Sequence, residues 1–150
     1  RDSYYSSADL VLMGTSGEGF GLPSVEAMMC GTPVLGSSNT ATREIVGGYN
    51  RDWLLNTDLT YWVGENVSYS APSVETIKKG IYNMMDNHPR EKHVEKVREY
   101  AVKNFGVETA GKALVKKIAN FIEWYYEDQC WEIPQRGKTI IERVKGGLIK

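Results

Sequence analysis

The chain has few cysteines, no long apolar run and almost no excess charge, and each scarcity excludes a class of protein. Cys30 and Cys130 lie a hundred positions apart in no metal-binding or redox spacing, which favours a reduced, intracellular chain. No segment approaches the roughly 18 apolar residues of a membrane span, and no signal-peptide pattern is present. A net charge of −1 argues against a protein that binds nucleic acid with its whole surface, although it leaves a local basic patch open, and no nucleic-acid partner is expected. We expect a cytoplasmic protein.

What is present is the composition of one globular α/β domain. The 150 residues are 41% hydrophobic and 25% charged, enough for a single core. The first part of the chain predicts a buried strand at 10–13, a glycine-rich loop at 14–21, a helix at 23–30 and a second strand at 32–36. Two parallel strands joined by a helix form a crossover unit. The predicted fold class is therefore α/β, part of a doubly wound parallel, Rossmann-like sheet.

The rest of the chain is less regular and then helical. Gly47 and Gly48 predict a turn, residues 61–63 predict a third strand, and residues 53–55 fit either a strand or a loop. Apolar residues spaced by three and four predict helices from Ser73 as N-cap, from Val94 and from about Glu108. The segment 135–150 carries five Lys or Arg against one Glu, which leaves contact with anionic lipid open as well as a solvated tail or a final helix.

The glycine-rich loop carries the densest chemical information. It follows the carboxyl end of a strand and opens a helix, where parallel sheets bind ligands and where free helix amides attract phosphate. Gly17, Gly19 and Gly21 alternate, so the dinucleotide fingerprint is not matched, and Gly-Lys-Ser/Thr is missing. Neither a nicotinamide cofactor nor a P-loop nucleotide is supported.

Two carboxylates, Glu18 and Glu26, lie on either side of the helix start. The plain interpretation is that Glu26 complements the helix dipole and that Glu18 is solvated. Together with the loop, however, they suit a ligand that carries both phosphate and hydroxyl groups, since a carboxylate accepts hydrogen bonds from a ribose diol. A site in which backbone amides bind phosphate and carboxylates bind hydroxyl groups fits a nucleotide sugar.

The segment Glu18-Gly-Phe-Gly-Leu-Pro-Ser-Val-Glu26-Ala-Met, followed by Cys-Gly-Thr-Pro-Val, closely resembles the signature of retaining GT-B glycosyltransferases. It is similar to the large group 1 family that includes sucrose synthase and glycogen synthase-like enzymes. The resemblance implies that Glu26 binds the donor ribose and that Glu18, the catalytic candidate, contacts the transferred sugar. It further implies donor contacts from five residues: Gly19, Phe20, Gly21, Leu22 and Pro23.

The resemblance also implies a domain organisation. Residues 1–128 would be the carboxyl-terminal half of the donor-binding domain of a GT-B fold, with earlier strands and a basic loop upstream in a longer polypeptide. Residues 129–150 would be an extension that packs on the amino-terminal domain. The donor would be linked to UDP or GDP, the acceptor would be a carbohydrate or a lipid-linked sugar, and no metal or cofactor would be required. The family commonly has a Gly-Gly turn where this chain has residues 39–42, so no ligand role is implied there.

Three other functions remain open on the residues alone. A glycoside hydrolase would use Glu18 and Glu26 as acid and nucleophile, which requires carboxyl groups about 5 Å apart. A nucleotide-sugar epimerase can share the fold, and a non-catalytic nucleotide-sugar-binding module would need only the loop. His88 and His93 lie near a helix start, where a helix-capping or surface role is expected rather than catalysis or metal binding.

Overall fold

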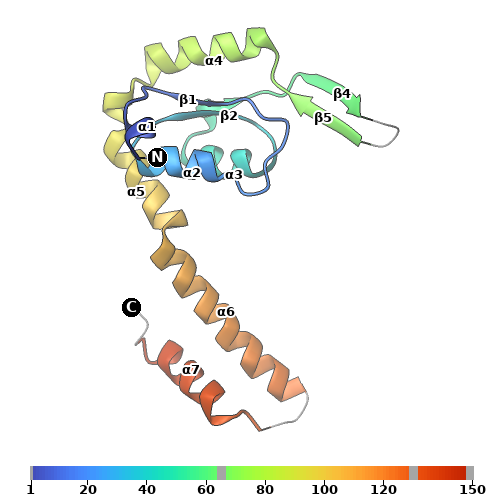
Figure 1. Cartoon of the computed structure of the whole chain (residues 1–150), viewed down its shortest axis with the longest axis vertical. Helices are drawn as coiled ribbons and strands as arrows, with labels where there is room; N and C mark the ends of the chain where they lie inside the picture. Colours follow the sequence, from blue (N-terminus) through green and yellow to red (C-terminus); the bar gives the residue numbers. More distant parts are fainter. Residues whose placement is uncertain (1, 64–66, 129–131, 148–150) are drawn as a thin grey trace. The chain divides into compact units, whose positions relative to one another are not determined.

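The computed structural model describes residues 2–63, 67–128 and 132–147, and it divides the chain into two compact units (Figure 1). The first unit spans residues 1–102 and the second spans residues 103–150. Elements of the first unit are α1 (Asp2–Ser6), β1 (Val11–Met13), α2 (Leu22–Met29), β2 (Val34–Ser37), α3 (Thr40–Tyr49), the 3₁₀ turn η1 (Arg51–Trp53), β3 (Leu54–Leu55), β4 (Leu59–Val63), β5 (Val67–Ala71), α4 (Val74–Asn87), the 3₁₀ turn η2 (Arg90–Lys92) and most of α5 (Val94–Phe105). The second unit contains α6 (Val107–Asp128) and α7 (Gln135–Lys145).

A three-stranded parallel sheet forms the centre of the first unit, in the order β1-β2-β3. Val11 pairs with Val34, and Gly36 pairs with Leu54. Every residue of the middle strand β2 is buried, as expected of a parallel strand covered on both faces. Figure 1 shows α4 on one face of the sheet and α2 with α3 on the other. The predicted α/β class is confirmed.

The third strand of the sheet is not the one that the sequence predicts. Residues 54–55, ambiguous in the sequence, form β3, whereas residues 61–63 belong to β4 in a separate antiparallel hairpin with β5. The reason is burial, because Leu55 is buried against the sheet and every residue of β4 is exposed. A run of aromatic and β-branched residues therefore predicts a strand correctly without predicting which sheet it joins.

Gly47 and Gly48 form no turn but lie inside α3. A Cβ atom on Gly47 would lie 2.8 Å from Leu54 Cδ1, and one on Gly48 would collide with Tyr100 Oη. These glycines let α3 approach its neighbours closely, and this packing requirement outweighs the preference of glycine for turns.

Trp53 is fully buried and is surrounded by aromatic rings. Its ring centroid lies 4.8 Å from that of Tyr49, 5.1 Å from that of His93 and 6.1 Å from that of His88. The Tyr49 hydroxyl and His93 Nδ1 are 3.1 Å apart, and burial lowers the pKa of His93 from its usual value. Both histidines thus pack against the core. Among the described residues, no group of three or more His, Cys, Asp or Glu side chains is placed to hold a metal ion.

Gly31 ends α2 in the left-handed conformation that the sequence predicts, with a φ of 76°. A Cβ atom there would lie 2.8 Å from Val94 Cγ1 and 3.0 Å from the Val94 carbonyl oxygen. We expect Gly31→Ala to lower the free energy of unfolding by about 1–3 kcal/mol, because overpacking adds to backbone strain. Urea denaturation measures this. Gly111→Ala, where a Cβ would meet open space inside α6, is the control and should not destabilise the protein.

Asp58 fixes the base of the β4–β5 hairpin to the start of α4. Its carboxylate accepts hydrogen bonds from the Ser73 hydroxyl (2.6 Å), the Ser73 amide (2.6 Å) and the Thr76 hydroxyl (2.8 Å). The Ser73 hydroxyl also accepts from the Thr76 amide at 3.2 Å, which confirms Ser73 as the N-cap.

These hydrogen bonds, that of the Ser73 hydroxyl foremost, lower the pKa of Asp58 from 3.8 to about 2. Because the folded state favours the ionised carboxylate more than the unfolded state does, the stabilisation is fully present from about one pH unit above the unfolded pKa of 3.8. It is lost as the pH falls through about 2. A carbon-13 NMR titration of the Asp58 carboxyl should show a midpoint near 2, and a midpoint at the ordinary 3.8 would contradict these contacts.

The second unit is a helical hairpin of α6 and α7. Ile122 and Ile133 lie beside Gly137, where a Cβ atom would be 3.2 Å and 3.0 Å from their Cγ2 atoms. Lys145 Nζ forms an ion pair with Glu123 at 2.6 Å, and Lys138 Nζ forms one with Glu132 at 3.0 Å. The basic segment is thus helical over Gln135–Lys145, and two of its cations are paired. In the described parts of the chain, no helix combines the length and apolarity needed to cross a bilayer. Cys130 lies outside the described residues.

Candidate functional site

The glycine-rich loop leaves the carboxyl end of β1 and leads into α2, as the sequence predicts. Gly21 precedes the helix with a φ of 77° and is buried, a conformation that favours glycine. Its carbonyl oxygen accepts hydrogen bonds from the amides of Ser24 (3.0 Å) and Val25 (3.3 Å), which begin the helix. Leu22 and Pro23 are exposed, so the helix amino terminus is accessible to a ligand.

Two residues of the loop offer an open surface. A Cβ atom on Gly19 would meet no atom within 4 Å, and the Phe20 ring is 56% exposed. A ligand can therefore approach the backbone at Gly19 directly, next to a large apolar ring. Such a combination of accessible backbone and aromatic surface is typical of small-molecule sites.

Glu18 is held through its backbone. Its amide donates a 2.9 Å hydrogen bond to Thr40 Oγ1 at the start of α3. Thr40 has a φ of 44°, a left-handed conformation that costs a β-branched residue about 1–3 kcal/mol. The strain lies where α3 meets the loop, and the hydrogen bond to Thr40 Oγ1 restrains the backbone of the residue that carries the carboxylate.

Asn39 connects the loop to two other segments. Its side-chain amide donates to the carbonyl oxygens of Ser16 (3.0 Å) and Ser70 (3.1 Å), with a longer approach of 3.4 Å to that of Thr15. Asn39 Oδ1 and Thr15 Oγ1 are buried without a hydrogen-bond partner among the described residues. Buried acceptors without partners are costly, and their presence at the carboxyl edge of the sheet is consistent with a polar ligand or water there.

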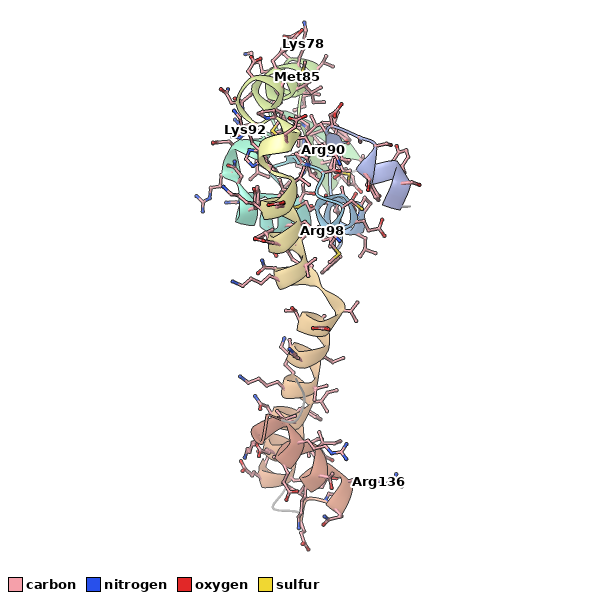
Figure 2. All side chains as sticks on the ribbon, turned by 90° about the vertical axis from the view of Figure 1, so that its left-hand side faces the viewer. Lys78, Met85, Arg90, Lys92, Arg98 and Arg136 are labelled. Atoms are coloured by element: carbon pink, nitrogen blue, oxygen red, sulfur yellow. The ribbon has the colours of Figure 1, made fainter. Side chains whose placement is uncertain are left out.

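Glu26 lies one turn into α2 on the side of α1. Its carboxylate accepts a 3.2 Å hydrogen bond from the Tyr5 hydroxyl, and its side chain is half-buried. It lines a hollow of about 340 Å³ together with Ser6, Met29, Cys30 and Arg98. Figure 2 labels Arg98 on α5 beside α2, so an arginine borders the same hollow as the carboxylate.

The two carboxylates thus have different neighbours. Glu18 adjoins α3 through Thr40, whereas Glu26 adjoins α1 through Tyr5. The exposed start of α2 lies between them in the sequence. The sequence singles out both acids but not Tyr5, Thr40 or Asn39, because local patterns carry no signal for contacts 21–23 positions apart.

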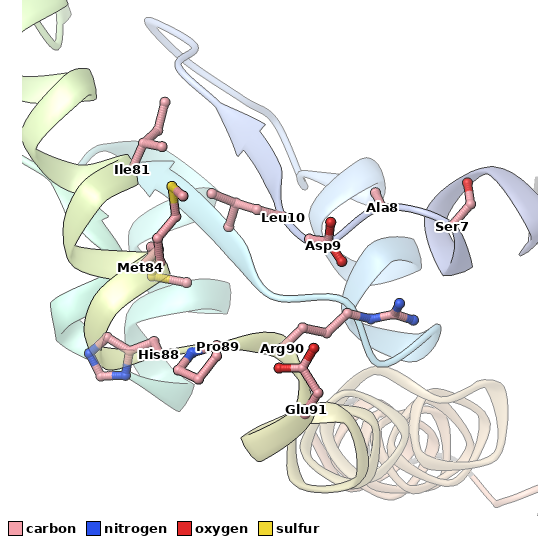
Figure 3. Close-up of a pocket in the computed structure, with 11 residues that line it drawn as sticks. Ser7, Ala8, Asp9, Leu10, Ile81, Met84, His88, Pro89, Arg90 and Glu91 are labelled. Atoms are coloured by element: carbon pink, nitrogen blue, oxygen red, sulfur yellow. The ribbon is translucent and has the colours of Figure 1, made fainter.

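A second cavity, of about 630 Å³, lies at the other end of β1 (Figure 3). In this view Leu10, Ile81 and Met84 form an apolar side, while Asp9, Arg90 and Glu91 bring charged groups. It adjoins the amino end of the strand, away from the glycine loop. Ligands of parallel sheets bind at the carboxyl ends of the strands, so we do not assign this cavity to the site.

Comparison with known proteins adds one positive finding. Residues 2–104 match the family model described as glycosyl transferases group 1, and this range includes the loop and both carboxylates. No curated protein matched the chain, and no solved structure did.

Proposed function

The chain belongs to the group 1 glycosyl transferases, and from this premise we propose that the loop between β1 and α2 binds the donor of a sugar transfer that retains anomeric configuration. The donor is a nucleoside diphosphate sugar, linked to UDP or GDP. The acceptor is a carbohydrate or a lipid-linked sugar.

One observation carries the proposal. An accessible helix amino terminus at the carboxyl end of a parallel strand lies between Glu18 and Glu26 in the sequence, within the range that matches the family. Backbone amides and the positive end of a helix bind a diphosphate. Carboxylates bind hydroxyl groups. Along a nucleotide sugar, the hydroxyls of the transferred sugar come first, the diphosphate follows, and the hydroxyls of the ribose come last.

Each residue has a role in the proposal. Glu26 accepts hydrogen bonds from the ribose hydroxyls, and the Tyr5 hydroxyl orients its carboxylate. Leu22 and Pro23, at the start of α2, adjoin the diphosphate, whose expulsion is the difficult step. Backbone amides and a helix dipole that already point at the leaving diphosphate stabilise its developing negative charge, and this kind of electrostatic stabilisation is usually the largest contribution to catalysis.

The transferred sugar lies against the backbone of Gly19, Phe20 and Gly21 in this proposal. Glu18 contacts its hydroxyl groups and stabilises the positive charge that develops on the ring. These are proposed contacts, and they require that the loop keep its position on Thr40.

Incubation with a panel of nucleotide sugars tests the activity. UDP-glucose, UDP-N-acetylglucosamine or GDP-mannose would be mixed with a tetrasaccharide as acceptor, and the products would be followed by NMR. The anomeric configuration follows from the H1–H2 coupling constant for glucose and N-acetylglucosamine, and from the one-bond C1–H1 coupling constant for mannose. Transfer with retention supports the proposal. Inverted product, free sugar alone or an epimerised donor would indicate an inverting transferase, a hydrolase or an epimerase instead.

Thr40→Val should separate positioning from binding. Valine keeps the β-branched shape but cannot accept the hydrogen bond from the Glu18 amide. The loop conformation that this hydrogen bond favours is then less stable by about 1 kcal/mol. We expect kcat to fall about 5- to 10-fold with donor affinity unchanged, because each 1.36 kcal/mol changes a rate about tenfold.

The matched control is Thr139→Val in α7, which also loses a 2.9 Å side-chain hydrogen bond, in that case to the Gln135 carbonyl. Its kcat should stay at the wild-type value. A Thr40→Val enzyme whose kcat does not change would contradict the positioning role.

The remaining features of the proposal concern the surroundings of the site. We propose a cytoplasmic location, and a domain that spans residues 1–128 with residues 129–150 packed on an amino-terminal domain of the same polypeptide. Contact with anionic lipid through the basic segment 135–150 remains a further part of the proposal. The ion pairs of Lys138 and Lys145 reduce the charge that this segment can offer to lipid.

A further inference from the structure

The β4–β5 hairpin has an aromatic face that the proposed function leaves unused. Side chains alternate between the two faces of a strand, and Tyr61 pairs directly with Tyr69. One face therefore carries Leu59, Tyr61, Val63, Tyr69 and Ala71. The opposite face carries Thr60, Trp62, Ser68 and Ser70.

The two tyrosine rings on the first face stack on each other, and both keep exposed surface. Their centroids are 5.8 Å apart and their planes differ by 20°. Tyr61 is 47% exposed and Tyr69 is 40% exposed. Their apolar surface is therefore open to a small ligand.

Hydrogen bonds join this hairpin to the glycine-rich loop. The hydroxyls of Tyr61 and Ser16 are 2.5 Å apart. The Asn39 side chain donates to the Ser70 carbonyl of the hairpin and to the Ser16 carbonyl of the loop. The hairpin thus has a fixed position beside the loop, and its base is held on α4 by Asp58.

The hairpin contacts the loop at Ser16, two residues before Glu18 and thus further from the helix start. The start of α2 adjoins the proposed diphosphate, and Glu18 adjoins the transferred sugar. We propose that the face of Leu59, Tyr61, Val63 and Tyr69 binds the acceptor sugar by stacking, beside the loop that carries Glu18. This inference rests on the proposed function.

The chemistry of the face suits a sugar ring. A pyranose has an apolar face of C–H bonds and a rim of hydroxyls, and tyrosine offers a flat apolar ring with a hydroxyl at its edge. The hydroxyls of Tyr61 and Ser16 lie at the side of the face that adjoins the loop. Sugar hydroxyls can exchange hydrogen bonds with them while the ring stacks on the tyrosines.

The size of the face argues against a protein partner. Each strand has five residues, so the face measures about 17 Å by about 10 Å, on the order of 170 Å². A stable protein interface needs about 800 Å² from each partner. A few sugar rings fit the available surface, whereas a folded partner would leave most of its interface unsupported.

The test compares oligosaccharide binding with nucleotide binding by saturation-transfer-difference NMR. The probes are maltotetraose, cellotetraose, chitotetraose and α-1,6-mannotetraose, and in parallel UDP and GDP. In the wild-type protein at least one tetrasaccharide should give signals from its ring protons. In Tyr61→Ala/Tyr69→Ala these signals should fall at least fivefold, with the nucleotide signals unchanged.

Two control variants make the outcome specific. Trp62→Ala removes an exposed ring from the opposite face and should leave both kinds of binding unchanged. Tyr61→Phe keeps the stacking ring but loses the hydroxyl, so it should retain most of the oligosaccharide signal. If nucleotides bind but no tetrasaccharide does, or if the double variant binds the tetrasaccharide normally, the inference is wrong and the proposed function stands. If neither UDP nor GDP binds, the proposed function itself fails.

Discussion

Replacing Glu26 with alanine is expected to weaken the binding of the donor nucleotide about 30-fold. The proposed contact joins the ribose hydroxyls to a carboxylate, and a hydrogen bond to a charged group contributes about 1.5–3 kcal/mol. A loss of about 2 kcal/mol corresponds to about 30-fold in Kd. Isothermal titration calorimetry with UDP and GDP measures the change.

Two variants separate a direct contact from an indirect effect. Tyr5→Phe leaves the carboxylate in place but removes its 3.2 Å hydrogen bond, so donor affinity should fall by less than in Glu26→Ala. Glu99→Ala removes an exposed carboxylate from α5 and should bind the nucleotide as the wild type does. Equal affinities for Glu26→Ala and the wild type would exclude Glu26 as the ribose ligand.

Trp53→Ala is expected to cause the largest loss of stability, about 3–5 kcal/mol, because truncating a fully buried aromatic side chain leaves a cavity. Contacts with Tyr49, His88 and His93 would be lost together. For a unit of about 100 residues this corresponds to a fall of roughly 15–30 °C in Tm. Thermal unfolding followed by circular dichroism measures the change.

A milder substitution at the same position sharpens this prediction. The Trp53 Nε1 group is buried without a partner among the described residues, so Trp53→Phe removes an unpaired donor and keeps most of the packing. Its cost should be well below that of Trp53→Ala. Trp62→Ala, where the ring is 69% exposed, should change the stability by no more than about 0.5 kcal/mol. Similar losses for Trp53→Ala and Trp62→Ala would contradict the account of the core.

The first part of the fold could be predicted because its signals are local. A continuous apolar run marks β1, glycines mark the loop, and Gly31 marks the end of α2 through its positive φ. Regular apolar spacing likewise gives α4 and α5 with starts that agree with the structure. Each of these features depends on neighbours within a few residues.

The features that escaped prediction depend on distant contacts. Gly47 and Gly48 lie in a helix because Leu54 and Tyr100 pack against them. Leu54 and Leu55 form a strand because β2 lies beside them. Tyr61 lies near the glycine loop through a contact with Ser16, 45 residues away in sequence. None of these arrangements can be recognised from the residues that are adjacent in the sequence.

The candidate site divides in the same way. Glu18 and Glu26 could be found from their spacing about a glycine-rich helix start. The groups that hold them, Thr40 and Tyr5, could not be, since each lies on a separate element. The sequence thus indicates the residues proposed to contact the donor, and the structure adds the residues that position them.

Titration of the nitrogen-15-labelled protein with UDP and GDP, followed by amide chemical shifts, tests the central claim most directly. If the start of α2 binds the diphosphate, the largest shifts fall on the amides of residues 19–22 and 24, at the carboxyl end of β1. If they fall instead on residues 7–10, 88, 90 and 91, around the cavity at the amino end of β1, the nucleotide binds elsewhere and the account of the loop is wrong.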